Sequence, residues 1–188
     1  MDKEIRNLIP PIAGLGNDWT LFEYEVGKRF EGHQPEAYTL PVSVVIPVYN
    51  RKEKLAKTIA ALTHQTYPHD LIEIVIADDG SSDHPEELLD TFSSSFSMRY
   101  IRQDDDGYRL SEIRNKGVAA SSHEQIIILD CDMLPLPSLV ESYMKYAHVS
   151  KKAVLIGGRR YVNTDDVTYE DILLDINSAA SWPSLRMD

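Results

Sequence analysis

The chain has 188 residues, of which 43% are hydrophobic and 26% charged, so it can form one globular domain with a sizeable core. A formal net charge of -11 argues against nucleic acid as a main partner, because a phosphate backbone is bound by clustered lysines and arginines. The one cysteine, Cys131, excludes an intrachain disulfide and a cysteine-cluster metal site. No apolar run reaches the length of a transmembrane segment, so we expect a cytoplasmic protein that at most lies peripherally on the inner face of the membrane.

Residues 1–40 are interrupted by prolines and glycines, and we expect an amino-terminal leader or packing arm there. The domain itself is expected over residues 41–188. Apolar runs rich in β-branched residues predict its strands at residues 42–47, 72–77, 98–101, 125–129 and 153–156. Amphipathic segments predict helices at residues 51–64, 83–92, 111–119, 138–147 and 167–178. Strands that alternate with helices are typical of parallel βαβ units.

Short polar side chains precede the first three predicted helices. A side chain in this position can accept a hydrogen bond from a free N–H group of the first helical turn. We therefore expect Asn50 to cap the first helix, Asp83 or Ser82 the second, and Ser111 the third.

The predicted strand at residues 125–129 is followed at once by two acids, Asp130 and Asp132. Its run of large apolar residues predicts a strand that is buried on both faces. Ligands of an open α/β sheet bind at the carboxyl ends of the strands, where these acids stand. Carboxylate oxygens suit Mg²⁺ or Mn²⁺, and a metal held there could also hold a substrate diphosphate. The alternative is a solvated acidic turn without a ligand.

Four motifs lie between strand ends and helix starts: Pro47-Val48-Tyr49-Asn50, Asp78-Asp79-Gly80-Ser81-Ser82-Asp83, Arg114-Asn115-Lys116-Gly117 and Leu129-Asp130-Cys131-Asp132. With these motifs in this order, the chain resembles glycosyltransferase family 2, and within it the domains of bacterial chondroitin- and hyaluronan-type polysaccharide polymerases. The resemblance covers about residues 41–165. It implies an α/β fold of the GT-A (Rossmann-like) type, with a mostly parallel sheet and helices on both faces. It also implies inverting transfer of a sugar from a metal-bound UDP-sugar to a glycan or polysaccharide acceptor.

The resemblance also implies which residues form the nucleotide-sugar site: Pro47, Tyr49, Asn50, Asp78, Asp79, Arg114, Asp130, Cys131 and Asp132. By this resemblance, Asp130 and Asp132 are the carboxylates that bind the metal and the ribose–diphosphate part of the donor, with Mn²⁺ or Mg²⁺ as the cofactor. The Asp78–Asp79 pair accepts hydrogen bonds from uracil or ribose.

Each of these side chains also has an ordinary structural explanation. The ring of Tyr49 can lie against a flat base, but an aromatic in this position can equally pack in the core. One acid of the Asp78–Asp79 pair could cap a helix. Arg114 could pair with a phosphate or form a salt bridge on its own helix. Cys131 alternates in direction with its two acidic neighbours, which favours packing.

The sequence departs from the family after Asp132. Family members continue into an acceptor-binding half that carries an acidic general base and often a Gln-x-x-Arg-Trp motif, and neither motif is found here. The acids nearby are spaced as on a solvated loop and helix face: Asp165, Asp166, Glu170, Asp171 and Asp175. The catalytic base is therefore unassigned, and we expect a truncated domain that binds donor but transfers sugar slowly.

Two other functions are considered. One is a non-catalytic donor-binding module whose acceptor half is missing or supplied by a complementing chain or a second copy. The other is a phospho-receiver domain, suggested by its acidic pair and an Asp at a strand end. Receivers carry the acidic pair after the first strand, whereas Asp78 and Asp79 follow the second predicted strand, and a Lys-Pro after a later strand is missing.

Overall fold

The computed structural model describes residues 39–149, 154–159 and 161–176. Of the expected amino-terminal arm, only the last two residues lie within these ranges. Among the described helices, none is long and apolar enough to cross a membrane.

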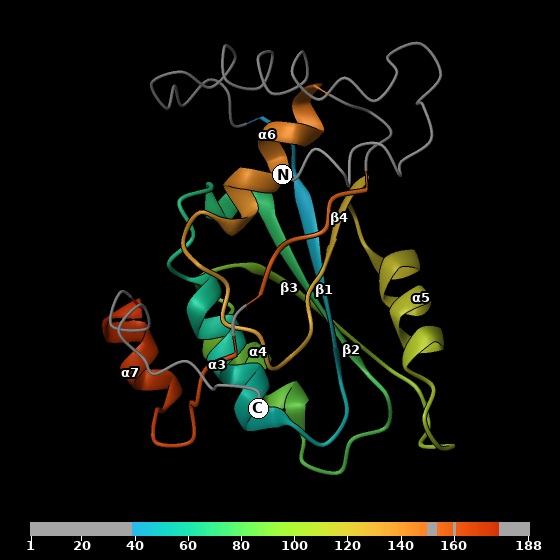
Figure 1. The fold of residues 1–188 in the computed structure, drawn as a ribbon. Coiled ribbons are helices and arrows are strands. Elements are labelled where there is room, and N and C mark those ends of the chain that lie inside the picture. The colour runs from blue at the N-terminus through green and yellow to red at the C-terminus, as the bar shows by residue number, and fades with distance from the viewer. Residues whose placement is uncertain (1–38, 150–153, 160, 177–188) are drawn as a thin grey trace, which may run out of the picture.

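Four parallel strands form the sheet in the order β3-β2-β1-β4 (Figure 1). Their bounds are β1 Val42–Val48, β2 Ile72–Asp78, β3 Ser97–Arg102 and β4 Gln125–Ile128. The last residues of three strands are in register, because Val48 pairs with Asp78 and Asp78 pairs with Arg102. The loops that follow β1, β2 and β3 therefore leave the sheet at the same edge.

The helices follow the strands in the alternation that the sequence predicts. Their bounds are α3 Lys52–Leu62, α4 Leu88–Phe92, α5 Leu110–Ala120, α6 Leu139–Val149 and α7 Tyr169–Leu174, with short 3-10 helices η2 His69–Leu71 and η3 Pro85–Glu87. In Figure 1, α5 lies on one side of the sheet and α3 and α4 on the other. The predicted α/β fold, with a parallel sheet and helices on both faces, is confirmed.

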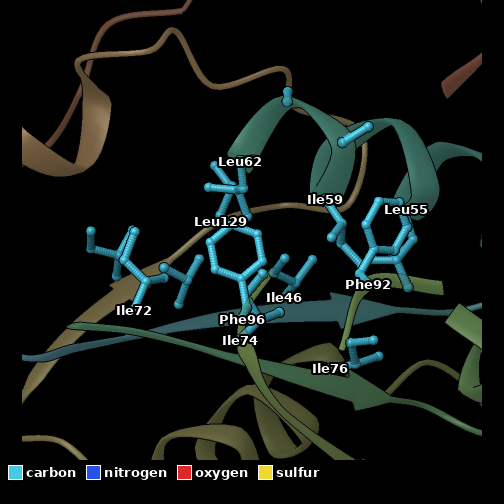
Figure 2. Close-up of a cluster of buried hydrophobic side chains, with 14 of the residues drawn as sticks. Ile46, Leu55, Ile59, Leu62, Ile72, Ile74, Ile76, Phe92, Phe96 and Leu129 are labelled. Carbon is cyan, nitrogen blue, oxygen red and sulfur yellow. The ribbon is translucent and has the colours of Figure 1, made fainter. Parts of the chain in front are cut away.

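The two central strands, β1 and β2, are buried on both faces, since their alternate residues enter two separate apolar clusters. In β2, Ile74 and Ile76 pack in the larger cluster with α3 and α4, as Figure 2 shows for the labelled side chains. Val75 and Ala77 pack in the smaller cluster against Ile113 of α5. Packing on both faces thus holds β2 in one direction and fixes the position of its carboxyl end.

Two strand predictions differ from the structure. β4 was expected to be buried on both faces, but Ile128 is 51% exposed, because among the described strands β4 pairs with β1 alone. The fifth predicted strand is wrong in its described part, since residues 154–156 have no regular structure, and Val154 and Ile156 are each 92% exposed. An apolar run does not by itself provide a neighbouring strand to pair with.

The predicted caps are also wrong. The helices α3 and α5 have Arg51 and Arg109 at their N-cap positions, without a side-chain cap, and Ser111 lies inside α5. Neither η3 nor α4 has a side-chain cap. The last helix does begin with a capping box, formed by Thr168 and Asp171.

Candidate functional site

Three of the four motifs lie at the carboxyl edge of the sheet, whereas the third, Arg114-Asn115-Lys116-Gly117, lies within α5 and not between a strand end and a helix start as expected. Three segments leave the in-register ends of β1, β2 and β3: residues 49–51, 79–84 and 103–109. The fourth, residues 129–138, follows β4, whose neighbour at its end is Val45 of β1. This is the edge at which ligands bind in open parallel sheets.

Asp78 is the last residue of β2 and is fully buried. Its Oδ1 accepts hydrogen bonds from the backbone N–H of Ser81 (2.9 Å) and from the Ser81 hydroxyl (2.5 Å). Its Oδ2 accepts one from the hydroxyl of Tyr100 (2.6 Å), and the guanidinium of Arg102 lies 3.5 Å away. Burial raises the pKa of Tyr100, and the hydrogen bond to Asp78 raises it further, so this hydroxyl stays protonated and donates.

Asp79 is also buried, at 5% exposure, but its partners differ. One oxygen accepts from the side-chain amide of Gln103, and the other accepts from the backbone N–H of Arg109 (3.1 Å), the residue before α5. The Gln103 carbonyl accepts from the ammonium group of Lys116 (2.8 Å), which favours the amide orientation that donates to Asp79. The carboxylate of Asp79 therefore joins the end of β2 to the start of α5.

Tyr49 and Asn50 form an exposed turn after the buried Pro47. The ring of Tyr49 is 45% exposed and belongs to neither apolar cluster, and its hydroxyl donates to Asp105 (2.9 Å). This hydrogen bond and the charge of Asp105 raise the pKa of Tyr49. The exposed ring is thus available to lie against a flat ligand.

The acids that follow β4 are half-exposed and paired with arginines. Asp130 accepts from Arg114 (2.5 Å), and Asp132 accepts from Arg51 (3.0 Å), with side-chain exposures of 46% and 43% for the two acids. Arg114 thus pairs with a motif acid on another element, which differs from the salt bridge on its own helix considered from the sequence. Exposed carboxylates at a strand end can exchange these partners for a ligand.

Cys131 lies between the two acids but turns inwards. It is 8% exposed and packs in the larger apolar cluster, and its backbone carbonyl accepts from the hydroxyl of Thr58 (2.8 Å). Burial raises the pKa of its thiol to about 11. Its side chain anchors the turn, so that the neighbouring acids Asp130 and Asp132 face solvent.

The donor set fits a hard divalent cation that also binds a diphosphate. Within the described ranges, no group of three or more His, Cys, Asp or Glu side chains could hold a metal ion alone. Mg²⁺ and cations like it commonly use one or two protein carboxylates and take their other ligands from phosphates and water. Asp130 and Asp132 can supply that number of oxygen ligands, and they are accessible.

A hollow of about 700 Å³ lies beside Asp79, at the end of β3. It is lined by Arg102, Gln103, Asp104, Asp105, Asp106, Arg109 and Lys116. Three of these residues are basic and three are the acids of residues 104–106. One of these acids, Asp105, accepts the hydrogen bond of Tyr49. The hollow thus adjoins the side chains expected to contact the nucleotide.

Sequence reasoning gave no role to several residues of this edge, although one of them, Lys116, belongs to the third motif: Arg51, Gln103, Arg109 and Lys116. Gln103 could have been found from its position, because it lies two residues after the predicted strand at residues 98–101, at the carboxyl edge. The backbone N–H of Arg109 gives no signal in the sequence.

Residues 43–184 match the family described as glycosyl transferase family 2. The chain is 40% identical to the chondroitin synthase of Escherichia coli over 168 residues, which are 88% of this chain and 24% of that protein. It is 30% identical to the hyaluronan synthase of Pasteurella multocida over 179 residues, which are 95% of this chain and 18% of that protein. The chain therefore spans about a quarter or less of the length of these relatives.

Two solved structures share the fold. One is residues 1–349 of TarS from S. aureus in complex with UDP-GlcNAc, with a TM-score of 0.51, 20% identity, and coverage of 55% of this chain and 30% of TarS 1–349. The other is a mannosyltransferase from Pyrobaculum calidifontis in complex with GDP-Man and Mn²⁺, with a TM-score of 0.52, 19% identity, and coverage of 68% and 39%. The fold, the order of the motifs and the match over residues 43–184 lead to one conclusion: the chain belongs to glycosyltransferase family 2.

Proposed function

We propose that this chain binds a UDP-sugar together with Mn²⁺ or Mg²⁺, and that it forms the donor-binding part of an inverting glycosyltransferase that extends a polysaccharide. The observation that carries this proposal is the pair of half-exposed acids, Asp130 and Asp132, at the same sheet edge as Tyr49 and Asp79. The names of the relatives support a polysaccharide product, and the ligands in the two related structures support a nucleotide-sugar donor and a divalent metal.

The residues of the edge can divide the work of binding the donor. The exposed ring of Tyr49 offers a face to the uracil base, and Asp79 offers an acceptor to a base N–H or ribose hydroxyl. Asp130 would accept from a ribose hydroxyl and would help to hold the diphosphate through the cation, and Arg114 beside it would pair with a phosphate oxygen. Asp132 would hold the divalent cation, which when bound acts as a Lewis acid for the departing UDP.

Transfer also needs a base that accepts the proton of the acceptor hydroxyl as that hydroxyl attacks. We assign this base to none of the described residues. Asp171, one of the acids considered from the sequence, is used as a helix cap with Thr168, and these hydrogen bonds lower its pKa. A donor-binding module that works with a complementing chain or with a second copy is therefore the alternative function. A cytoplasmic location, peripheral to the membrane, stays part of the proposal.

The family assignment removes the phospho-receiver alternative. The sheet order agrees, because receivers have the strand order 2-1-3-4-5, whereas the four described strands follow the order β3-β2-β1-β4. Asp78 is the last residue of the second described strand and Asp79 follows it, so the acidic pair stands at the end of the second strand and not of the first.

The experiment measures release of UDP from several UDP-sugars with Mn²⁺, with and without oligosaccharide acceptors. We expect metal-dependent UDP release that Asp132→Asn reduces about fivefold or more, since the loss of a charge-assisted contact is worth about 1–3 kcal/mol. The matched control is Asp90→Asn, which removes an exposed carboxylate from α4. Equal rates for the wild type and Asp132→Asn would contradict the proposed function.

A further inference from the structure

The buried carboxylate of Asp78 has no surface left for a ligand. It is 0% exposed, and its two oxygens accept from the backbone and hydroxyl of Ser81 and from Tyr100, with Arg102 at 3.5 Å. An ionised carboxylate has about four sites that accept hydrogen bonds. Three hydrogen bonds and the nearby charge of Arg102 satisfy the buried carboxylate, so Asp78 differs from the half-exposed Asp130 and Asp132.

The hydrogen bonds of Asp78 continue into the loop after β1. The Ser81 hydroxyl donates to Asp78 and at the same time accepts from the backbone N–H of Asn50 (2.9 Å). A serine hydroxyl has one proton to donate and two lone pairs that accept. Because the carboxylate takes the proton, the lone pairs of Ser81 are turned towards the N–H of Asn50. The oxygen of Asp78 that accepts this proton thus sets which way the hydroxyl points.

Asn50 needs this support, because its backbone has a positive φ of 49°, which is uncommon for a residue other than glycine. Its side-chain carbonyl accepts from the backbone N–H (2.8 Å) and the hydroxyl (3.0 Å) of Ser82. On the other side of Tyr49, the carbonyl of Val48 accepts from the backbone N–H of Asp79 (2.9 Å). Tyr49 is therefore held between two points of contact with the loop after β2.

We propose that Asp78 is a positioning residue that acts through Ser81 and Asn50 to set the direction of Tyr49, and that it does not touch the nucleotide. The assignment rests on the proposed function, and it separates the two acids of the Asp78–Asp79 pair. Asp79 contacts Gln103 and Arg109, and Asp78 contacts Arg102, and all three of these partners line the hollow; Asp78 alone is also linked through Ser81 to the turn that presents the Tyr49 ring.

The first test needs no ligand and follows hydrogen exchange of the Asn50 amide by NMR. Asn50 is exposed, so its N–H should exchange slowly only if Ser81 accepts from it. We expect exchange about tenfold faster in Ser81→Ala and in Asp78→Asn, as for the loss of one hydrogen bond. Tyr100→Phe is the matched control, since it removes a partner of Asp78 and leaves the link to Ser81, and exchange should stay within about twofold of the wild type.

The second test measures the affinity of the same variants for UDP with Mn²⁺. Ser81→Ala and Asp78→Asn should both weaken binding about five- to tenfold, because both release the loop that carries Tyr49. Tyr100→Phe should lower the melting temperature but keep the affinity for UDP within about twofold of the wild type. If Asp78 affected UDP binding only through the stability of the fold, Tyr100→Phe would weaken that binding as well.

The outcomes separate this inference from the proposed function. If Asp78→Asn weakens UDP binding and Ser81→Ala binds as the wild type does, Asp78 is a direct ligand and the inference is overturned. Unchanged exchange of the Asn50 amide in Ser81→Ala overturns it as well, whether or not Asp78→Asn folds. If the wild type binds no UDP, the proposed function fails, and the exchange rates still decide whether Asp78 orders this loop.

Discussion

Gly80 lies where the turn after β2 passes against the loop after β3. Its backbone has a φ of +90°, and a Cβ built there would lie 2.5 Å from the backbone N of Asp105 and 2.7 Å from its Cα. Both are main-chain atoms, so the loop itself would have to move. Asp105 accepts the hydrogen bond of Tyr49, and a displaced loop would therefore also disturb the proposed binding site for the uracil base.

Gly80→Ala should lower the free energy of unfolding by about 2–5 kcal/mol. A left-handed backbone costs an L residue about 1–2 kcal/mol, and forcing a packed contact apart costs about 1–3 kcal/mol. In a chain of this size, each kcal/mol corresponds to about 2–4 °C, so the melting temperature should fall by roughly 4–20 °C. Thermal and urea unfolding followed by circular dichroism measure both quantities.

Gly107→Ala is the matched control for Gly80→Ala. Gly107 also has a positive φ, of +76°, but a Cβ there would meet nothing within 4 Å. It should therefore cost only the backbone term, about 1–2 kcal/mol. A cost for Gly80→Ala no larger than that for Gly107→Ala would refute the close approach of the two loops.

Two further predictions concern the core. Burial raises the pKa of Glu73, but hydrogen bonds from Ser43 and Ser122 outweigh it and hold the pKa below its usual range. The ionised Glu73 therefore stabilises the fold above the pKa that it has in the unfolded chain, and this stabilisation is lost as pH falls through the folded pKa. Urea unfolding from neutral pH to about pH 3 should show this loss in the free energy of unfolding. Glu73→Gln should lower the free energy of unfolding by about 1–3 kcal/mol at neutral pH and make it depend less on pH. Gly117→Ala would place a Cβ 2.5 Å from Cγ1 of Val45. This close contact should lower the free energy of unfolding by about 1–3 kcal/mol, and the better helix propensity of alanine should offset about 1 kcal/mol of that loss. A smaller loss in a Val45→Ala background would identify the contact.

The sequence predicted β1, β2 and β3 to within about two residues. The β-branched runs of β1 and β2 are typical of strands covered on both faces, and the two apolar clusters provide that cover. Residues 154–156 have a similar composition but form no strand, and pairing is a property of the whole fold that a local run cannot show.

The caps failed for a similar reason. The backbone N–H of Lys52, at the start of α3, donates to the side chain of Asp83, which is 31 residues away (2.8 Å). Asn50 was expected to cap that helix, but its side chain is engaged with Ser82 instead. A rule based on the neighbouring residue cannot identify a partner from another loop.

The candidate site was predictable where it depends on strand ends. Parallel strands bring their carboxyl ends to one edge, which places the Asp78–Asp79 pair and the Asp130–Asp132 pair on the same side of the sheet. The sequence could not distinguish a fully buried Asp78 from a half-exposed Asp132. That difference depends on Tyr100 from β3, which the alternation of elements does not reveal.

The most direct test of the account is calorimetry of UDP binding to this chain with and without Mn²⁺, for the wild type and for Asp132→Asn. We expect Mn²⁺ to strengthen UDP binding in the wild type, and Asp132→Asn to weaken the metal-dependent binding by about 1–3 kcal/mol while the melting temperature without metal stays nearly unchanged. Equal UDP affinity with and without Mn²⁺ in the wild type would contradict the metal-bound donor site, and unfolding of Asp132→Asn would show that this acid is structural.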